Sequence, residues 1–218
     1  MFQRHQLIYI NSDSSFSIKS CHRDIDTLSK HVVEWFKKGL PCVCARQSTD
    51  DGYVKLGLPL YVGKEKHRVA LVVNSSSIIK QQPLPKLIEM QDFFFKFYGI
   101  EGLDALIRTQ QVMKISVYGS FLFHYLSGQF IVDEKSDLDL LIDYSEFTLD
   151  ALNELIQAIN KLFNRTIDGE VRFHQLGDVS LHELLDDSTK NVLYKHPVGV
   201  ELLLRDELYE RYPSLCCV

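Results

Sequence analysis

Residues 117–144 read VYGSFLFHYLSGQFIVDEKSDLDLLIDY, and this stretch decides the fold. A β-forming run ends at Val117, Gly119 and Ser120 follow it, and a segment with helical character comes next. The later part, SDLDLLIDY, reads as a strand in which polar and apolar residues alternate at its start. The stretch therefore predicts a strand, a Gly-Ser turn, a helix and a second strand in succession.

Two carboxylates occupy alternate positions near the start of the second strand. Asp137 and Asp139 should project from one face, while Leu138 and Leu140 point into the core behind them. Like charges this close repel, which favours a hard divalent cation between them. Magnesium fits, because it takes one or two carboxylates plus substrate phosphates. The alternative is a solvated polar face near a sheet edge.

The Gly-Ser turn supplies a second half of the same pattern. Gly119 and Ser120 stand at a predicted helix N-terminus, where backbone N–H groups attract phosphate. Glycine allows close approach of phosphates, and the serine hydroxyl donates a hydrogen bond to a phosphate oxygen. A Gly-Ser turn followed by two alternate aspartates on the next strand is more specific than either motif alone.

The rest of the chain divides at residues 75–86, which contain serine, glutamine and two prolines and suit an exposed connector. Strands are expected before it at residues 4–10, 41–47, 53–62 and 67–74, with one helix at residues 25–39. Helices at residues 86–98, 102–108 and 149–163 and a strand at 165–175 are expected after it. We therefore expect an α+β protein with a β-rich domain, residues 1–84, and a catalytic domain, residues 85–218.

The composition limits which partners and which cellular compartment are expected for this protein. A net charge of −5 and a pI near 5.9 give no overall attraction to nucleic acid or to an anionic membrane, so neither is expected as a partner. The start resembles no signal peptide and no apolar run reaches the roughly 20 residues of a membrane helix, so we expect a cytoplasmic protein. The five cysteines should be reduced thiols, because C-x-C and C-C do not match usual zinc spacing.

Basic and aromatic residues carry weaker signals. Arg46 and Lys195 are candidate phosphate-binding cations and Arg68 is a weaker one, although each is also explained as a solvated side chain. His5 and His124 are better explained as surface or satisfied core histidines than as catalytic ones. The aromatic run at residues 93–99 predicts a buried helix face rather than a surface for base stacking.

The combined pattern VYGS and SDLDLL resembles the nucleotidyltransferase superfamily related to DNA polymerase beta. This resemblance implies a polymerase-beta-like mixed sheet with flanking helices, and a third carboxylate on a later strand. RTIDGEVRF offers Asp168 and Glu170, which share one face. Sequence cannot choose between them, and we favour Glu170 as the third metal-binding carboxylate and catalytic residue beside Asp137 and Asp139.

The whole chain also resembles the malonate decarboxylase holo-acyl-carrier-protein synthase family, or phosphoribosyl-dephospho-CoA transferases. The matching segments are RHQLIYI, WFKKGLPCVCAR, LGLPL, VYGSFLFHYLSGQFIVDEKSDLDLLID, IDGEVRF and VLYKHPVGVEL. The chain departs from the family at Phe123, where tryptophan is common, and at Ala45-Arg46, where paired arginines are common.

This resemblance implies transfer of the phosphoribosyl-dephospho-CoA group from triphosphoribosyl-dephospho-CoA to a serine of a small acyl carrier protein, with release of pyrophosphate. The carboxylates would hold magnesium and Gly119 and Ser120 would bind phosphate. Two alternatives stay open: another nucleotidyltransferase that modifies a small molecule or a protein, and a non-catalytic, antitoxin-like relative. The presence of both Asp137 and Asp139 argues against the last.

Overall fold

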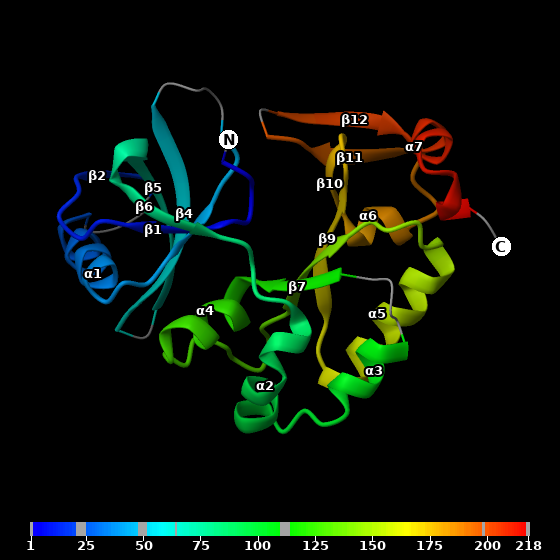
Figure 1. The fold of residues 1–218 in the computed structure, drawn as a ribbon, viewed down its shortest axis with the longest axis horizontal. Helices are drawn as coiled ribbons and strands as arrows, with labels where there is room; N and C mark the ends of the chain where they lie inside the picture. The colour runs from blue at the N-terminus through cyan, green and yellow to red at the C-terminus, as the bar shows by residue number, and fades with distance from the viewer. Residues whose placement is uncertain are drawn as a thin grey trace. The chain divides into compact units, whose positions relative to one another are not determined.

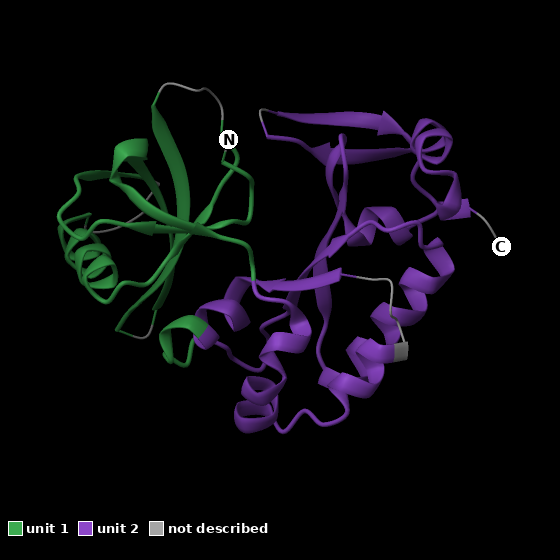
Figure 2. Ribbon diagram, in the orientation of Figure 1, with its two compact units in different colours: residues 1–84, 126–131 green, residues 85–125, 132–218 purple. Residues whose placement is uncertain are grey.

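The computed structural model describes residues 2–20, 25–47, 52–63, 65–109, 114–197 and 199–216. The chain forms two compact units, coloured separately in Figure 2. Unit 1 contains residues 1–84 and 126–131, and unit 2 contains residues 85–125 and 132–218. Each unit is built on one six-stranded sheet (Figure 1). The α+β class expected from sequence is confirmed, with an antiparallel sheet in unit 1 and a mixed sheet with helices in unit 2.

Unit 1 is an antiparallel sheet with one helix. Its strands, in the order β2-β5-β4-β3-β1-β6, are β1 (Leu7–Ile10), β2 (Phe16–Ser20), β3 (Cys42–Cys44), β4 (Tyr53–Val62), β5 (Glu65–Asn74) and β6 (Ile78–Gln82). The helix α1 (Ile25–Lys37) buries one stripe of side chains, namely Leu28, Val32, Trp35 and Phe36. This spacing of three and four residues is that of one helix face. Gly39, at φ +66°, follows the helix end as the sequence predicted.

The expectation of an exposed connector at residues 75–86 was wrong in part. A 3-10 turn (Ser75–Ser77) and strand β6 occupy most of that segment, and β6 pairs antiparallel with β1. An edge strand has a partner on one side only, so it tolerates the exposed polar residues that resembled a linker. The short strand β2, which also lies at a sheet edge, was missed for the same reason.

Unit 2 surrounds a mixed sheet in the order β12-β11-β10-β9-β8-β7. Its strands are β7 (Lys114–Tyr118), β8 (Leu138–Asp143), β9 (Ile167–Phe173), β10 (Gly177–Ser180), β11 (Asn191–Lys195) and β12 (Val200–Leu204). Its helices are α2 (Gln91–Tyr98), α3 (Leu103–Thr109), α4 (Gly119–Ser127), α5 (Leu149–Phe163), α6 (Leu181–Leu185) and α7 (Arg205–Arg211). Two 3-10 turns complete it, Leu87–Met90 and Pro213–Cys216. Among the strands of the described residues of unit 2, only β8 and β9 pair in parallel.

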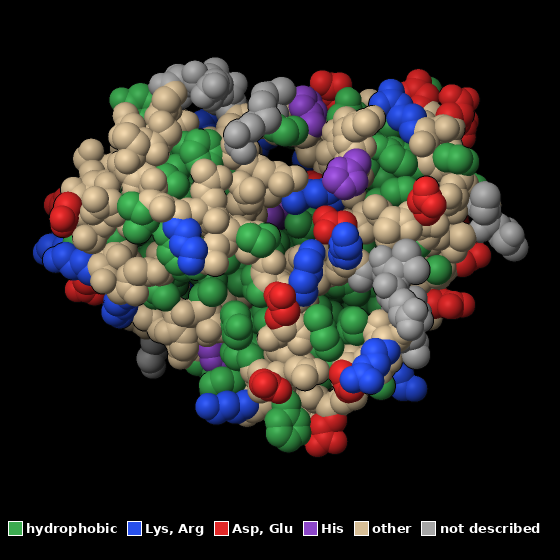
Figure 3. Space-filling model, in the orientation of Figure 1, with side chains coloured by type: hydrophobic (Ala, Val, Ile, Leu, Met, Phe, Trp, Pro, Cys, Tyr) green, Lys and Arg blue, Asp and Glu red, His purple; other side chains and the backbone are tan. Residues whose placement is uncertain are grey.

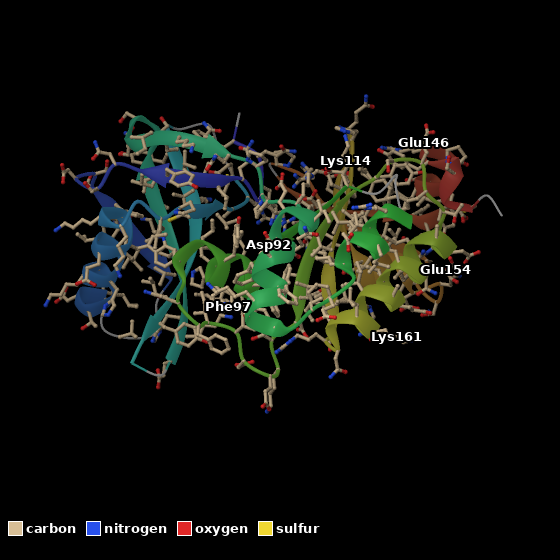
Figure 4. All side chains as sticks on the ribbon, turned by 60° about the horizontal axis from the view of Figure 1, so that its bottom comes forward. Asp92, Phe97, Lys114, Glu146, Glu154 and Lys161 are labelled. Carbon is tan, nitrogen blue, oxygen red and sulfur yellow. The ribbon has the colours of Figure 1, made fainter. Side chains whose placement is uncertain are left out.

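Helix α5 makes the crossover that a parallel pair of strands requires. Thr148 caps its first turn by accepting a hydrogen bond from Ala151 N at 3.1 Å. Its buried residues are Leu152, Leu155, Ile159 and Phe163. Figure 4 labels Glu154 and Lys161 on the same helix, and both are exposed. The helix predicted at residues 149–163 is confirmed at both ends.

The aromatic run of α2 is divided between core and surface. Phe93 and Phe94 are buried, whereas Phe95 is 58% and Phe97 47% exposed. Phe94 packs edge-on against Phe163 of α5, with ring centroids 4.9 Å apart. The predicted buried face therefore holds for the first two phenylalanines only. Figure 4 labels Asp92 and Phe97 on α2.

The helices and the cysteines bear on two further expectations from the sequence. None of the helices in the described ranges has both the length and the apolar character needed to span a bilayer. Cys42 and Cys44 lie buried in β3 as reduced thiols, and burial raises the pKa of Cys44 to about 11. Cys216 is exposed, and Cys21 and Cys217 lie outside the described residues. Figure 3 shows acidic and basic side chains interspersed over the visible surface.

Candidate active site

The sheet of unit 2 has one apolar and one polar face. On β8, Leu138, Leu140 and Ile142 are fully buried in the core. Asp139 and Asp143 alternate with them and therefore project from the opposite face. Asp137 stands immediately before β8 and is exposed. The predicted division between a core face and an acidic face is therefore confirmed on this strand.

The turn between β7 and α4 brings Gly119 against Asp139. Gly119 is the first residue of α4 and has φ +66°, a conformation that favours glycine. A Cβ atom added to Gly119 would lie 1.8 Å from Oδ2 and 2.6 Å from Cγ of Asp139. The carboxylate therefore occupies the space that any other side chain at position 119 would need. The two sequence motifs, Gly-Ser and D-x-D, meet at this contact.

Ser120 is the second residue of α4 and is buried. Its position at the start of a nine-residue helix places the residue in the first turn, where backbone N–H groups have no partner within the helix. Helix N-termini of this kind carry partial positive charge. The Asp139 carboxylate, packed against Gly119, therefore lies beside a region that attracts anions.

Arg165 holds the loop that precedes Asp137. Its Nη1 donates hydrogen bonds to the carbonyl oxygens of Asp133 at 2.6 Å and Ser136 at 3.0 Å. Its guanidinium also lies 5.4 Å from the ring centroid of Phe121, which belongs to α4. One side chain thus contacts both the loop before the first aspartate and the helix after the Gly-Ser turn. Arg165 was not predicted from the sequence, because no local pattern marks a contact over about thirty residues.

Strand β9 brings Asp168 beside Asp139. The two residues are Cα partners in the parallel register, as are Leu140 and Gly169. A Cβ atom on Gly169 would lie 2.1 Å from the carbonyl oxygen of Leu140, so only glycine allows this close approach of the strands. Asp168 is exposed and accepts a hydrogen bond from Gly169 N at 2.7 Å.

Glu170 lies two residues further along β9, beside Leu141 rather than Asp139. Two residues of a strand span roughly 6–7 Å. Glu170 is buried, and its Oε1 accepts a hydrogen bond from Lys195 Nζ at 2.7 Å. The structure therefore unites two predicted site residues, Glu170 and Lys195, in one ion pair.

Two further ion pairs lie on this face of the sheet. Arg172 donates two hydrogen bonds to Asp178, at 2.7 and 2.9 Å, and both side chains are largely buried. Lys86 Nζ lies 3.0 Å from Ser116 Oγ and 3.4 Å from Asp143 Oδ2. Neither pair was predicted from the sequence. Arg172 occupies an alternate position of β9 with Asp168 and Glu170, so the sequence places all three side chains on one face of the sheet. This was the one sequence feature that could have indicated a role for Arg172.

The other residues considered from the sequence belong to unit 1 or to α4. Arg46 follows β3 in unit 1 and is exposed, and Arg68 is an exposed residue of β5. His5 is a buried residue of unit 1. His124 is buried in α4, and its Nδ1 lies 2.6 Å from the Tyr98 hydroxyl. Burial lowers the pKa of His124, so a neutral ring is favoured in this aromatic environment.

The sequence matches two family descriptions that together span most of the chain. Residues 3–83 match the phosphoribosyl-dephospho-CoA transferase MdcG N-terminal domain, and residues 99–206 match the corresponding C-terminal domain. These matches define the protein class as a transferase. The chain belongs to the phosphoribosyl-dephospho-CoA transferase MdcG family, which confirms the resemblance found in its sequence.

Relatives named phosphoribosyl-dephospho-CoA transferase match along the chain. The one from Xanthomonas campestris pv. campestris strain 8004 is 30% identical over 227 residues, covering 99% of each chain. That of Xanthomonas axonopodis pv. citri is 27% identical, over 96% of this chain and 97% of its own. That of Bradyrhizobium diazoefficiens is 28% identical, over 77% of this chain and 75% of its own. No solved structure matches this chain.

Proposed function

We propose that this protein transfers the phosphoribosyl-dephospho-CoA group from triphosphoribosyl-dephospho-CoA to a serine of the malonate decarboxylase acyl carrier protein. Family membership over both parts of the chain supports the donor and the acceptor. The observation that carries the chemistry is the packing of Asp139 directly against Gly119 at the start of α4. This packing places a carboxylate beside a helix N-terminus, which attracts phosphate.

A nucleotidyltransferase-like catalytic domain is part of this proposal. Its support is the succession of β7, the Gly-Ser turn, α4 and β8, followed by the parallel strand β9 that carries a further carboxylate. The alternative of a different nucleotidyltransferase shares these features and differs only in donor and acceptor.

Magnesium is the proposed cofactor, and the donor set is of the right chemical type. Asp137, Asp139 and a carboxylate of β9 supply oxygen ligands only, which is what magnesium prefers. Asp137 and Asp168 are exposed and form no ion pair with a lysine or arginine in the described ranges, so both carboxylates are available to a cation from outside the chain. When bound, magnesium would neutralise charge on the donor phosphates.

In this proposal, side chains and backbone N–H groups of the protein bind the donor, and a carboxylate accepts the proton of the carrier serine. Ser120 and the first N–H groups of α4 would donate hydrogen bonds to phosphate oxygens, and Gly119 adds no side chain of its own beside them. The serine oxygen of the carrier bonds to the α-phosphorus while the bond from that phosphorus to the bridging oxygen breaks. Pyrophosphate leaves with the electron pair, and the serine proton passes to a carboxylate on the acidic face. Lys195 and Arg46 are the further proposed phosphate-binding cations.

Two variants on β9 test which residue is the third carboxylate. Sequence alone favoured Glu170, whereas the strand register sets Asp168 beside Asp139 and Lys195 engages Glu170. We expect Asp168→Asn to lower kcat by about 1,000-fold and Glu170→Gln by only about tenfold, since a metal ligand contributes more than the partner of a lysine. Steady-state transfer assays measure both. The reverse order would assign the role to Glu170.

The proposed function is tested by the intact mass of the carrier protein. Malonate decarboxylase acyl carrier protein is incubated with this protein, magnesium and triphosphoribosyl-dephospho-CoA, with and without chelator. The expected result is a mass gain of one phosphoribosyl-dephospho-CoA group that the chelator prevents. Absence of a gain with this donor, together with a gain from ATP, would overturn the assignment in favour of another nucleotidyltransferase.

A further inference from the structure

Lys195 is the last residue of β11, where the strand turns back into β12. The two strands pair from Asn191 opposite Leu204 to Lys195 opposite Val200. Two backbone hydrogen bonds close the turn, from His196 N to Gly199 O at 3.1 Å and from Gly199 N to His196 O at 3.4 Å. Strand ends fray readily, so a functional lysine at this position needs further support.

Three polar side chains supply that support. The Tyr194 hydroxyl donates a hydrogen bond of 2.6 Å to Glu201 Oε2, and the two residues are direct partners across the strands. His196 Nε2 lies 3.2 Å from the other oxygen of Glu201, in a contact without hydrogen-bond geometry. We refer to Tyr194, His196 and Glu201 as the hairpin clamp.

Gly199 makes room for the clamp. A Cβ atom at this position would lie 2.7 Å from His196 Nε2 and 2.9 Å from Cε1. The imidazole therefore packs directly against the backbone of Gly199. The Tyr194 and His196 rings lie 5.6 Å apart between centroids, so both rings and the carboxylate of Glu201 hold the end of the hairpin.

The charge state of the clamp favours the same arrangement. The hydrogen bond from Tyr194 lowers the pKa of Glu201 and raises the pKa of Tyr194. Glu201 is therefore ionised and Tyr194 protonated at neutral pH, which is the combination that forms the hydrogen bond. The carboxylate also faces His196, to which it would bind more strongly if the ring were protonated.

Strand geometry links the clamp to Lys195. Side chains alternate along β11, so Tyr194 and Lys195 lie on opposite faces, and the His196 ring lies beside that of Tyr194. Holding residues 194 and 196 fixes the direction in which Lys195 projects. Its Nζ donates to Glu170 at 2.7 Å, and 31% of the side chain stays exposed. Since an ammonium has three donors, others are available to phosphate.

We propose that the hairpin clamp is a positioning device that holds Lys195 against Glu170, in the orientation in which Lys195 binds a phosphate of the donor. The clamp residues act through Lys195 and are positioning residues, not catalytic ones. The inference rests on the proposed function for the role of the phosphate, but the holding of Lys195 is independent of it. The two parts therefore have separate tests.

The first test needs no activity. Trace acetylation with acetic anhydride, followed by peptide mass spectrometry, measures how readily the Lys195 amine reacts. Glu201→Ala should weaken the ion pair between Lys195 and Glu170. The reactivity of Lys195 should then rise about two- to fivefold, as expected for loss of a partly exposed ion pair. Leu202→Ala is the matched control, because Leu202 is the next residue of β12 and is 68% exposed. Equal Lys195 reactivity in the wild type and Glu201→Ala would overturn the proposal.

The second test is a double-mutant cycle on transfer. Glu201→Ala should lower kcat/KM about tenfold in the wild-type background but not in a Lys195→Ala background, because the clamp acts only through the lysine. Glu201→Gln should recover most of the loss, since the amide oxygen still accepts from Tyr194. Losses that add in the double variant would reveal general destabilisation and overturn the positioning role. Absence of transfer by the wild type would overturn the proposed function and leave the labelling result standing.

Discussion

Asp139→Asn is expected to lower transfer by about 1,000-fold or more, because one ligand of the proposed magnesium is lost. Asp137→Asn should behave alike. The melting temperature should stay near that of the wild type, since asparagine has the same shape and removing one of two nearby like charges relieves repulsion. Initial rates of carrier-protein modification, measured beside thermal melts, check both expectations.

Asp143→Asn is the matched control for the acidic strand. Asp143 lies on β8 and on the same face as Asp139, but Lys86 contacts it at 3.4 Å. This variant should retain most of the activity, with a stability loss of at most about 1 kcal/mol, the usual limit for a partly exposed ion pair. Full transfer by Asp137→Asn or Asp139→Asn would contradict the proposed mechanism.

Gly119→Ala is expected to reduce transfer by about 100-fold or more, because the new methyl group displaces the Asp139 carboxylate from the helix N-terminus. The methyl carbon would begin 1.8 Å from Asp139 Oδ2, so the carboxylate must rotate away. The left-handed conformation at φ +66° adds a backbone cost of roughly 1–2 kcal/mol. Activity should therefore fall much further than stability, as transfer assays and denaturant melts would show.

Gly128→Ala separates the two contributions of that substitution. Gly128 has φ +67°, nearly the value at Gly119, but an added Cβ would meet nothing within 4 Å. It should show the same backbone cost of roughly 1–2 kcal/mol and retain transfer activity. Equal activity losses in Gly119→Ala and Gly128→Ala would show that backbone strain, rather than displacement of Asp139, explains the effect.

Elements with strong local patterns were predictable from the sequence. The strand, turn, helix and strand of residues 117–144 and the helix at 149–163 were all confirmed, because hydrophobic periodicity and turn residues act over a few positions. The edge strands β2 and β6 were missed, because an edge position relaxes the requirement for apolar residues.

The sequence by itself determined which residue types form the acidic face, since alternation along each strand decides which side chains share a face. Only the tertiary structure decided which of them meet. Parity could not distinguish Asp168 from Glu170, because the stagger between β8 and β9 depends on how α5 packs across the sheet and on the close contact at Gly169. Lys195 likewise reaches Glu170 over twenty-five residues of chain. Contacts of this kind arise from the packing of distant segments, for which no short-range sequence signal exists.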